Sequence, residues 1–274
     1  MAYDVIHNIT RKTQRHEVVQ PSGTAIEQHR TTYDWAYVYG GSQPHAPTQI
    51  GSQDGGVGPV VGRTFRYDAN GNQASWDHDQ NGTRRTLVWD DVQDGQVSWE
   101  ARTPGATDEN RLQSLFDNGH EKAYVYDDAG QRVIKRGPQG ETVYVNQWFT
   151  MRNGQAGTKH VFAGTERIVS KLMKQDDPGA NPKGKTPFEK DLYYFHPDHL
   201  GSSAYVTDAK AKLYQHLEYF PFGETWVEEV SNTQRTPYWY TAKELDEETG
   251  LYYYGARYYD PRTSVWQSAD PILG

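Results

Sequence analysis

Cysteine is absent from this chain of 274 residues, and its absence excludes two classes of structure. Without thiols the chain forms neither a disulfide framework nor a thiolate metal site, so packing and hydrogen bonds must hold the fold. Long hydrophobic runs are also missing, since nowhere do about 18 apolar residues follow one another. Residues 1–5 lack the basic start and apolar run of a secretory signal peptide. We therefore expect neither a signal peptide nor a membrane span in this chain.

Basic residues are in the minority. The chain has 28 Lys and Arg against 36 Asp and Glu, which gives a net charge of -8 and a pI near 5.7. Because a phosphate backbone is bound by concentrated Lys and Arg, nucleic acid is not an expected partner. The sequence also lacks a Gly-x-Ser-x-Gly elbow, a Walker loop, a His-Glu-x-x-His helix and a dinucleotide fingerprint. These absences argue against an independent hydrolase or kinase, and no cofactor is expected.

Aromatic and turn-forming residues are abundant instead. The chain contains 20 Tyr, 8 Trp and 8 Phe but only 3 Met, and its 26 Gly and 14 Pro are scattered along the sequence. Tyr, Trp and Phe suit a pleated, half-buried surface, and scattered Gly and Pro punctuate hairpins. This composition predicts an all-β chain with many hairpins.

A degenerate unit recurs along the chain: an aromatic strand, Tyr-Asp or a near relative, a few small residues with Gly or Asn, and another strand. The clear copies are 65–72 and 124–133, and a third, 3–9, opens the chain. Asp can accept hydrogen bonds from backbone amides two residues on, and Gly supplies the positive φ of a tight turn. The Tyr before it packs its ring on a neighbouring strand and keeps its hydroxyl for a polar partner. Because one hairpin is marginal in water, we expect the units to share one sheet. Weaker copies occur at 88–91, 142–146 and 204–210.

Several segments interrupt this pattern. Residues 40–59 are rich in Gly and Pro and are predicted to form a long loop, and 176–185 to form a polar surface insertion. Short helices are predicted at 107–113 and 224–230.

The segment 244–261 carries the most specific signal. It combines acids, a turn at Glu247-Glu248-Thr249-Gly250, two aromatic clusters and a terminal Asp260-Pro261. Together with 196–203 and 218–224, it resembles the core signature of the Rhs/YD-repeat family, which includes bacterial polymorphic toxins, C components of Tc toxins and the teneurins.

The resemblance implies a spiralling strand-turn-strand sheet that forms part of a shell around a C-terminal toxin, which this chain does not contain. It implies a YD-repeat region at 1–192 and an Rhs repeat-associated core at 193–274 that continues the same sheet. Partners would be the toxin cargo, further shell repeats or subunits, or a second copy. The protein would be bacterial, made in the cytoplasm and exported for delivery of its cargo to another cell.

Two carboxylates followed by Pro, Asp260 and Asp270, form a candidate catalytic site with Arg257. Two acids held together can share a proton, so that one activates water while the other stays ionised. Shells of the resembled family are aspartyl autoproteases that cut near an Asp-Pro-x-Gly-Leu motif, from which residues 268–274 depart. Self-cleavage is therefore expected only in a longer chain, and the alternative role of Asp260 is a turn cap.

His196, Asp198 and His199 are weak candidates for a metal site, since two imidazoles and a carboxylate are ligands that metals use. The intervening Pro197 restricts their convergence, so the favoured interpretation is a turn between strands and no metal.

A set of aromatic residues near the C-terminus suggests either a sugar-binding adhesion surface or a packed core. Alternation places Tyr252 and Tyr254 on one face and Tyr253 on the other, so part of the set must be core. Core packing is the favoured interpretation, and glycan binding is the alternative. The set comprises Tyr238, Trp239, Tyr240, Tyr252, Tyr253, Tyr254, Tyr258 and Tyr259.

Overall fold

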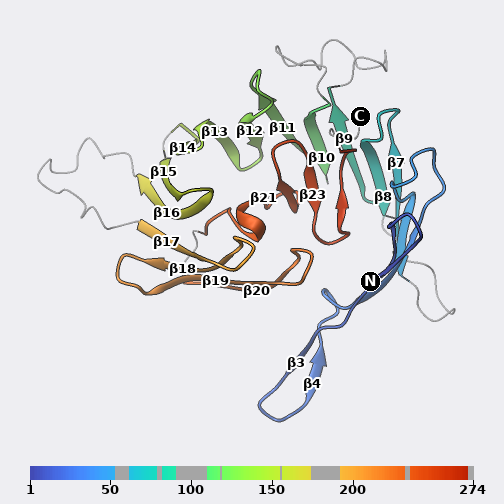
Figure 1. Cartoon of the computed structure of the whole chain (residues 1–274), viewed down its shortest axis with the longest axis horizontal. Coiled ribbons are helices and arrows are strands. Elements are labelled where there is room, and N and C mark those ends of the chain that lie inside the picture. Colours follow the sequence, from blue (N-terminus) through green and yellow to red (C-terminus); the bar gives the residue numbers. More distant parts are fainter. Residues whose placement is uncertain are drawn as a thin grey trace, which may run out of the picture. The chain divides into compact units, whose positions relative to one another are not determined.

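The chain is almost entirely β structure. A computed structural model describes residues 1–52, 62–78, 82–90, 110–117, 119–154, 156–173, 192–231 and 235–270. Eighteen strands belong to one sheet, and two smaller sheets have four and two strands (Figure 1). All the pairings described residue by residue are antiparallel and join strands that follow one another in the chain, apart from the β2 to β5 step. The predicted all-β, strand-turn-strand fold class is confirmed.

Two compact units divide the chain. The first comprises residues 1–88 and 115–119, in which β1, β2, β5, β6, β7, β8 and β9 pair in that order. Strands β3 and β4 pair only with each other, as a separate hairpin between β2 and β5. The strand bounds are β1 Ala2–Tyr3, β2 Ile9–Gln14, β3 Glu17–Val19, β4 Ala25–Glu27, β5 Tyr33–Val38, β6 Gln49–Ser52, β7 Gly62–Tyr67, β8 Gln73–His78 and β9 Arg84–Trp89.

The second unit comprises residues 89–114 and 120–274. Its strands from β11 to β20 pair consecutively in the large sheet, and β21 to β24 form the four-stranded sheet. Strand β10, Leu112–Asp117, has residues in both units. The other bounds are β11 His120–Tyr126, β12 Arg132–Gly137, β13 Gly140–Asn146, β14 Phe149–Arg152, β15 Ala156–Ala163, β16 Glu166–Met173, β17 Leu192–Pro197, β18 Ser203–Asp208, β19 Leu213–Tyr219, β20 Thr225–Val230, β21 Glu244–Asp246, β22 Leu251–Tyr253, β23 Tyr258–Asp260 and β24 Val265–Trp266.

The repeat turns are built as the sequence predicts. In each, one carboxylate oxygen of the Asp accepts hydrogen bonds from the amides two and four residues later, as Asp127 does from Ala129 at 3.1 Å and Gln131 at 2.7 Å. In two of the turns the Tyr before the Asp donates its hydroxyl to a carbonyl of an earlier segment: Tyr67 to Pro47 and Tyr126 to Leu112, both at 2.9 Å. Each turn is thus fixed locally by its Asp, and these two are also tied to the sheet by Tyr. The same Asp pattern occurs at Asp4, Asp68, Asp198 and Asp208.

A β-bulge accompanies every one of these turns. After Asp127, Tyr126 pairs with Arg132 but Val125 pairs with Ile134, so Val133 has no partner in the ladder. The residue that the ladder register skips is always the sixth after the Asp, or after Phe220 in the last hairpin. A bulge interrupts the two-residue alternation of a strand, so side chains three apart on either side of it share a face. The bulged residues are Thr10, Ala74, Val133, Ala204, Tyr214 and Trp226.

Several local expectations are wrong. The segment 224–230 is strand β20 and not a helix, because its alternating side chains pair with β19 through Tyr219, Glu218 and Leu217. Residues 112 and 113 of the other predicted helix begin strand β10, and 107–109 lie outside the described residues. The predicted long loop at 40–59 contains strand β6, which pairs with β5 and β7. The predicted insertion at 176–185 lies outside the described residues.

The core of the second unit lies between its two sheets. Leu217 from β19 packs with Trp239, Tyr252 and Tyr259, which are all buried. A second cluster joins Phe195, Val206 and Tyr214 from β17 to β19. These contacts place the β21 to β24 sheet against one face of the large sheet within this unit (Figure 1).

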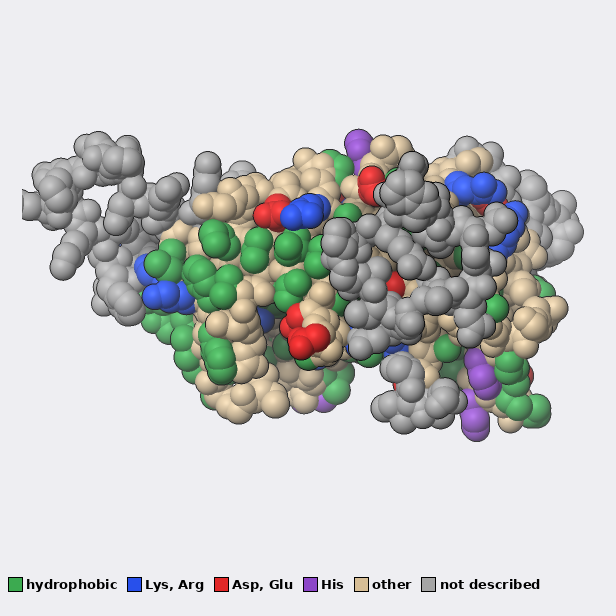
Figure 2. Space-filling model, turned by 90° about the horizontal axis from the view of Figure 1, so that it is seen from above, with side chains coloured by type: hydrophobic (Ala, Val, Ile, Leu, Met, Phe, Trp, Pro, Cys, Tyr) green, Lys and Arg blue, Asp and Glu red, His purple; other side chains and the backbone are tan. Residues whose placement is uncertain are grey.

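A row of apolar side chains lies on the other face of the large sheet, on strands β12 to β14. Ile134 pairs with Val143 and Val143 with Met151, which places three apolar side chains in one row across β12, β13 and β14. Trp148 and Val161 are also exposed, and hydrophobic side chains gather where β12 to β16 lie (Figure 2). On β12 to β14, the face away from the small sheet therefore carries a row of apolar side chains.

Candidate functional site

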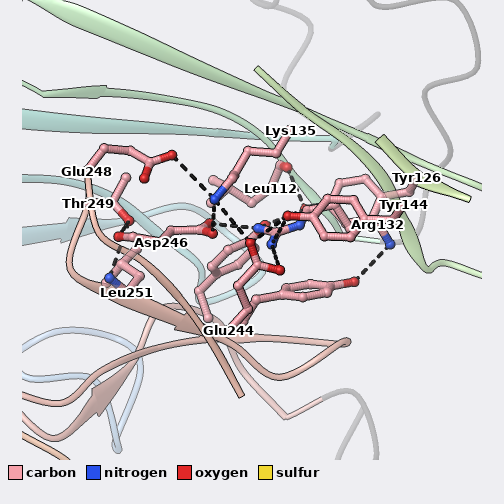
Figure 3. A network of polar contacts seen from close by, with 12 residues as sticks. Leu112, Tyr126, Arg132, Lys135, Tyr144, Glu244, Asp246, Glu248, Thr249 and Leu251 are labelled. Carbon is pink, nitrogen blue, oxygen red and sulfur yellow. Dashed lines mark hydrogen bonds and ion pairs between the residues drawn. The ribbon is translucent and has the colours of Figure 1, made fainter. Parts of the chain in front are cut away.

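A buried cluster of charges joins the small sheet to the large one. On β21, alternation places Glu244 and Asp246 on one face, and on β12 the bulge at Val133 brings Arg132 and Lys135 to one face. Figure 3 shows the two cations pointing from β12 toward the carboxylates of β21. Residues more than 100 positions apart in the sequence thus meet in one site.

Every charge in this cluster has an opposite partner. Arg132 Nη1 lies 2.6 Å from Asp246 Oδ2, and Arg132 Nη2 lies 3.2 Å from Glu244 Oε2. Lys135 Nζ lies 2.8 Å from Asp246 Oδ1, 3.2 Å from Glu244 Oε1 and 3.6 Å from Glu248 Oε1. The Arg132 and Asp246 side chains are fully buried, so their attraction is not weakened by solvent.

Tyrosines complete the site. The Arg132 guanidinium lies 4.3 Å from the ring centre of Tyr253 and 4.9 Å from that of Tyr144, within the range of cation–π attraction. Tyr144 donates its hydroxyl to Glu244 at 2.6 Å and accepts from Arg132 Nη2 at 2.9 Å. The hydroxyl of Tyr258 lies 3.2 Å from Arg132 Nη1. Polar atoms of the rings thus satisfy donors and acceptors that burial removes from water.

Electrostatics keep Glu244 and Lys135 ionised. Burial raises the pKa of the Glu244 carboxyl, but Lys135 and Arg132 outweigh burial and lower that pKa to about 2. Burial also lowers the pKa of Lys135, yet Asp246 and Glu244 raise it above its ordinary value. Groups that stay charged at neutral pH do not exchange protons there, so this arrangement positions the β21 to β24 sheet and is not suited to acid–base chemistry.

A second contact holds the small sheet against a hairpin turn. Tyr240 and Tyr259 donate their hydroxyls to the carbonyls of Pro221 at 2.9 Å and Phe222 at 3.0 Å. Tyr252 lies at 3.4 Å from the next carbonyl, that of Gly223. Gly223 has a φ of +85°, and a Cβ built on it would lie 2.5 Å from the Tyr240 ring. The Phe-Pro-Phe-Gly turn of the family signature is therefore a docking element for three tyrosines.

The predicted carboxylate site is only partly assembled. Arg257 Nη2 lies 2.9 Å from Asp270 Oδ2, and its guanidinium lies 4.1 Å from the ring centre of Trp266. Asp260 caps the turn after β23, since its Oδ1 accepts from the amides of Arg262 at 2.9 Å and Thr263 at 3.3 Å. Arg257 and Asp270 are thus brought together, while Asp260 has the turn-capping contacts that its alternative role requires.

The candidate metal residues occupy a repeat turn. Asp198 accepts from the amides of Leu200 and Ser202, both at 2.8 Å, and His196 Nε2 lies 2.9 Å from Thr207 Oγ1. His196 and His199 are exposed. Within the described residues, no group of three or more His, Cys, Asp or Glu has the arrangement of a metal site.

The eight aromatic residues considered for glycan binding are all buried or half-buried. Tyr252 has no exposed area and Tyr258 has 2%. Tyr253 and Tyr258 pack with ring centres 5.2 Å apart, and Tyr254 packs edge-on against Trp266 at 5.0 Å. These residues form the core of the second unit, the interpretation that alternation favoured.

Sequence reasoning did not single out Arg132 and Lys135. Strict alternation along this strand would place Arg132 and Lys135 on opposite faces. Only the bulge, six residues after Asp127, brings the two cations to one face. The acidic residues of 244–248 stand out in the sequence, but the sequence does not indicate which cations pair with them.

Comparison with known proteins relates the chain to shell-forming repeats. The family model of the teneurin YD-shell matches residues 111–273. The tRNA nuclease WapA of Bacillus subtilis is 28% identical over 209 residues, which are 74% of this chain and 8% of WapA. Toxin subunit YenC1 of Yersinia entomophaga is 42% identical over 85 residues, which are 30% of this chain and 8% of YenC1. The chain therefore corresponds to a small part of each of these relatives.

Solved structures with a similar trace include the TcdB2-TccC3-Cdc42 complex. It is 19% identical, with a TM-score of 0.49 over 94% of this chain and 16% of that chain. In the described part of this chain, no helix is long and apolar enough to cross a bilayer.

Proposed function

Because the chain belongs to the teneurin YD-shell family, we propose that it forms part of the wall of a shell that encloses a toxin segment in a longer protein. One of its relatives is named a tRNA nuclease and another a toxin subunit. Both names support a toxin as the enclosed cargo. The protein would be a bacterial product that is exported with its cargo. The toxic activity would belong to the enclosed segment and not to this chain.

The buried ion pair of Arg132 with Asp246 carries this proposal. It fixes the β21 to β24 sheet on one face of the large sheet, with Nη1 2.6 Å from Oδ2. A segment that follows β24 would start on that same face. We infer that a cargo would meet this face beyond the part that the small sheet covers, while the large sheet satisfies its own backbone groups.

Protease protection tests the proposal. The test protein is a longer form that includes this chain together with whatever its gene encodes on either side. We expect the segment after residue 274 to resist trypsin in the native protein and to be cut after denaturation. The Arg132→Met variant should expose it, whereas Arg136→Met should not. Equal cleavage of that segment in native and denatured protein would contradict a container role.

Self-cleavage is a second candidate, supported by the 2.9 Å contact of Arg257 with Asp270. The ion pair holds the Asp270 carboxylate in one position, where it could act on a water molecule. Intact-mass measurement of a form extended beyond Gly274 tests the idea. The parent should be cut, while Asp270→Asn should stay whole; Asp260→Asn shows whether the turn cap also takes part. An uncut parent excludes the activity.

Two further proposals follow from the family resemblance. The boundary between a YD-repeat region, 1–192, and an Rhs core region, 193–274, is one of them. Additional shell repeats or a second copy of the chain would cover strand edges that are otherwise open. Glycan binding by the aromatic set has no exposed ring to support it.

A further inference from the structure

The second unit contains a cavity of about 470 Å³ beside the charge cluster. One wall is the face of β13 to β17 that looks toward the small sheet, and the other is the segment from Arg235 to Glu248. A volume of this size lies in the range of ligand-binding pockets. The proposed container role does not by itself assign anything to it.

Hydroxyl groups cover the strand wall. Thr142, Thr150, Thr158 and Ser170 line the cavity from four successive strands. Thr150 and Thr158 are directly paired across β14 and β15, and His160 pairs with Ser170 across β15 and β16. Thr150 and Ser170 already contact His160 at 3.3 and 2.9 Å, so the hydroxyls of Thr142 and Thr158 are the ones that could donate to or accept from the backbone of an extended peptide.

The acids of the cavity are already neutralised. Glu244 and Glu248 contact Lys135, and Glu247 Oε2 lies 3.0 Å from Arg235 Nη2. Burial and Arg167 lower the pKa of His160 to about 3, so its ring is neutral. Lys135 and Arg235 are thus already paired with acids of the cavity.

Arg152 is the cation that stands apart. It lines the cavity, is exposed, and has no acidic partner among the described residues. It pairs across the sheet with Thr142, which also lines the cavity. A guanidinium without an acid at a cavity mouth matches the geometry of a carboxylate ligand.

Apolar side chains also line the cavity. Leu172, Phe195 and Tyr214 come from β16, β17 and β19, and Leu245 lies on the opposite wall. A ligand for this cavity therefore needs an apolar group within reach of its carboxylate.

We propose that the cavity binds an extended peptide segment in which an acidic residue lies next to an apolar one, with Arg152 as the partner of the carboxylate. The inference rests on the proposed function, because the enclosed cargo would supply that segment. General attraction does not account for such binding, since the chain has a net charge of -8 and repels acidic peptides as a whole. The selectivity comes from one arginine and the hydroxyls around it.

Fluorescence anisotropy with defined peptides tests the proposal on the 274-residue chain. The probes are fluorescein-labelled Gly-Ser-Leu-Glu-Phe-Ser-Gly and the same peptide with Gln in place of Glu. We expect the Glu peptide to bind about threefold to fivefold more tightly, because the arginine–carboxylate contact is charge-assisted but lies at an exposed side chain. Added salt should reduce the difference.

Variants locate the binding. Arg152→Gln should remove the preference for Glu, while Arg136→Gln, an exposed arginine of β12 paired with Glu141, should keep it. Thr158→Trp fills the cavity without removing a charge and should weaken both peptides. Circular dichroism confirms that each variant remains folded.

Two results overturn the proposal: no binding tighter than about 1 mM, or a preference for Glu that Arg152→Gln leaves unchanged. Either result leaves the container role standing if the protease test still shows protection. Loss of protection with peptide binding intact would instead remove the container role and keep the site.

Discussion

Arg132 and Asp246 form an ion pair in which neither side chain has any exposed area, with Nη1 2.6 Å from Oδ2. Removing two charges from water costs several kcal/mol per ion, so such a pair persists only where geometry and further hydrogen bonds compensate. Lys135, Glu244 and Tyr144 supply those contacts. The pair is better suited to fixing where the small sheet docks than to adding net stability.

Replacing Arg132 tests this role. Arg132→Met should lower the free energy of unfolding by about 3–5 kcal/mol, because Asp246 and Glu244 would be left with Lys135 alone. Arg136→Met is the matched control on the same strand, since Arg136 is exposed and pairs with Glu141 at 2.6 Å. The control should change stability by less than about 1 kcal/mol. Urea unfolding measures both, and similar losses in the two variants would contradict the assignment.

Stability should fall in acid through Glu244. Its pKa in the folded protein is about 2, below the ordinary 4.5, so its contribution is present above pH 4.5 and is lost as the pH falls toward 2. The midpoint of urea unfolding, measured across this range, should decrease on acidification. Glu244→Gln should be less stable at neutral pH and should show a shallower decrease. An unchanged slope in the variant would exclude Glu244 as a source of the pH dependence.

Two glycines separate backbone strain from steric contact. Gly201 and Gly223 have φ values of +81° and +85°, but only Gly223 has a ring where a Cβ would lie, 2.5 Å from Tyr240. Gly201→Ala should cost about 1–2 kcal/mol from the left-handed backbone alone. Gly223→Ala should cost more, because Tyr240 must also move away from the turn. Thermal unfolding compares the two, and equal losses would mean that the tyrosine contact adds nothing.

Neighbouring aspartates test the repeat turn. Asp127 accepts from the amides of Ala129 and Gln131, whereas Asp128 beside it is exposed. Asp127→Ala should cost about 1–2 kcal/mol, comparable to the loss of a helix cap. Asp128→Ala should change stability by less than about 0.5 kcal/mol. Chemical denaturation distinguishes them, and the turn model fails where Asp128 proves the more sensitive.

The repeat was predictable because its chemistry is local. Asp127 and Gly130 specify the turn within a few residues, and the structure confirms the bonds from Asp to the amides that follow. The prediction of a helix at 224–230 was wrong because it considered only local composition. Its Glu-rich run has the composition of a helix, but the ladder with β19 supplies more contacts than an isolated turn of helix could.

The docking site was not predictable from the sequence. Arg132 and Lys135 meet Asp246 only because β12 and β21 lie side by side in the folded chain, and nothing near them specifies that contact. The bulge at Val133 also shifts the alternation from which faces are assigned. Asp260 was a better case, since Asp followed by Pro indicates a turn wherever the strand lies.

The offset of six residues between a repeat aspartate and its bulge has a consequence for how such chains evolve. Inserting one residue between Gln131 and Val133 would turn Lys135 away from Asp246 and would leave the bonds from Ala129 and Gln131 to Asp127 intact. The turn that Asp127 fixes thus determines the direction in which Lys135 points toward the buried Asp246. The number of residues between the aspartate and the bulge must therefore stay constant in this repeat for the buried ion pair to form.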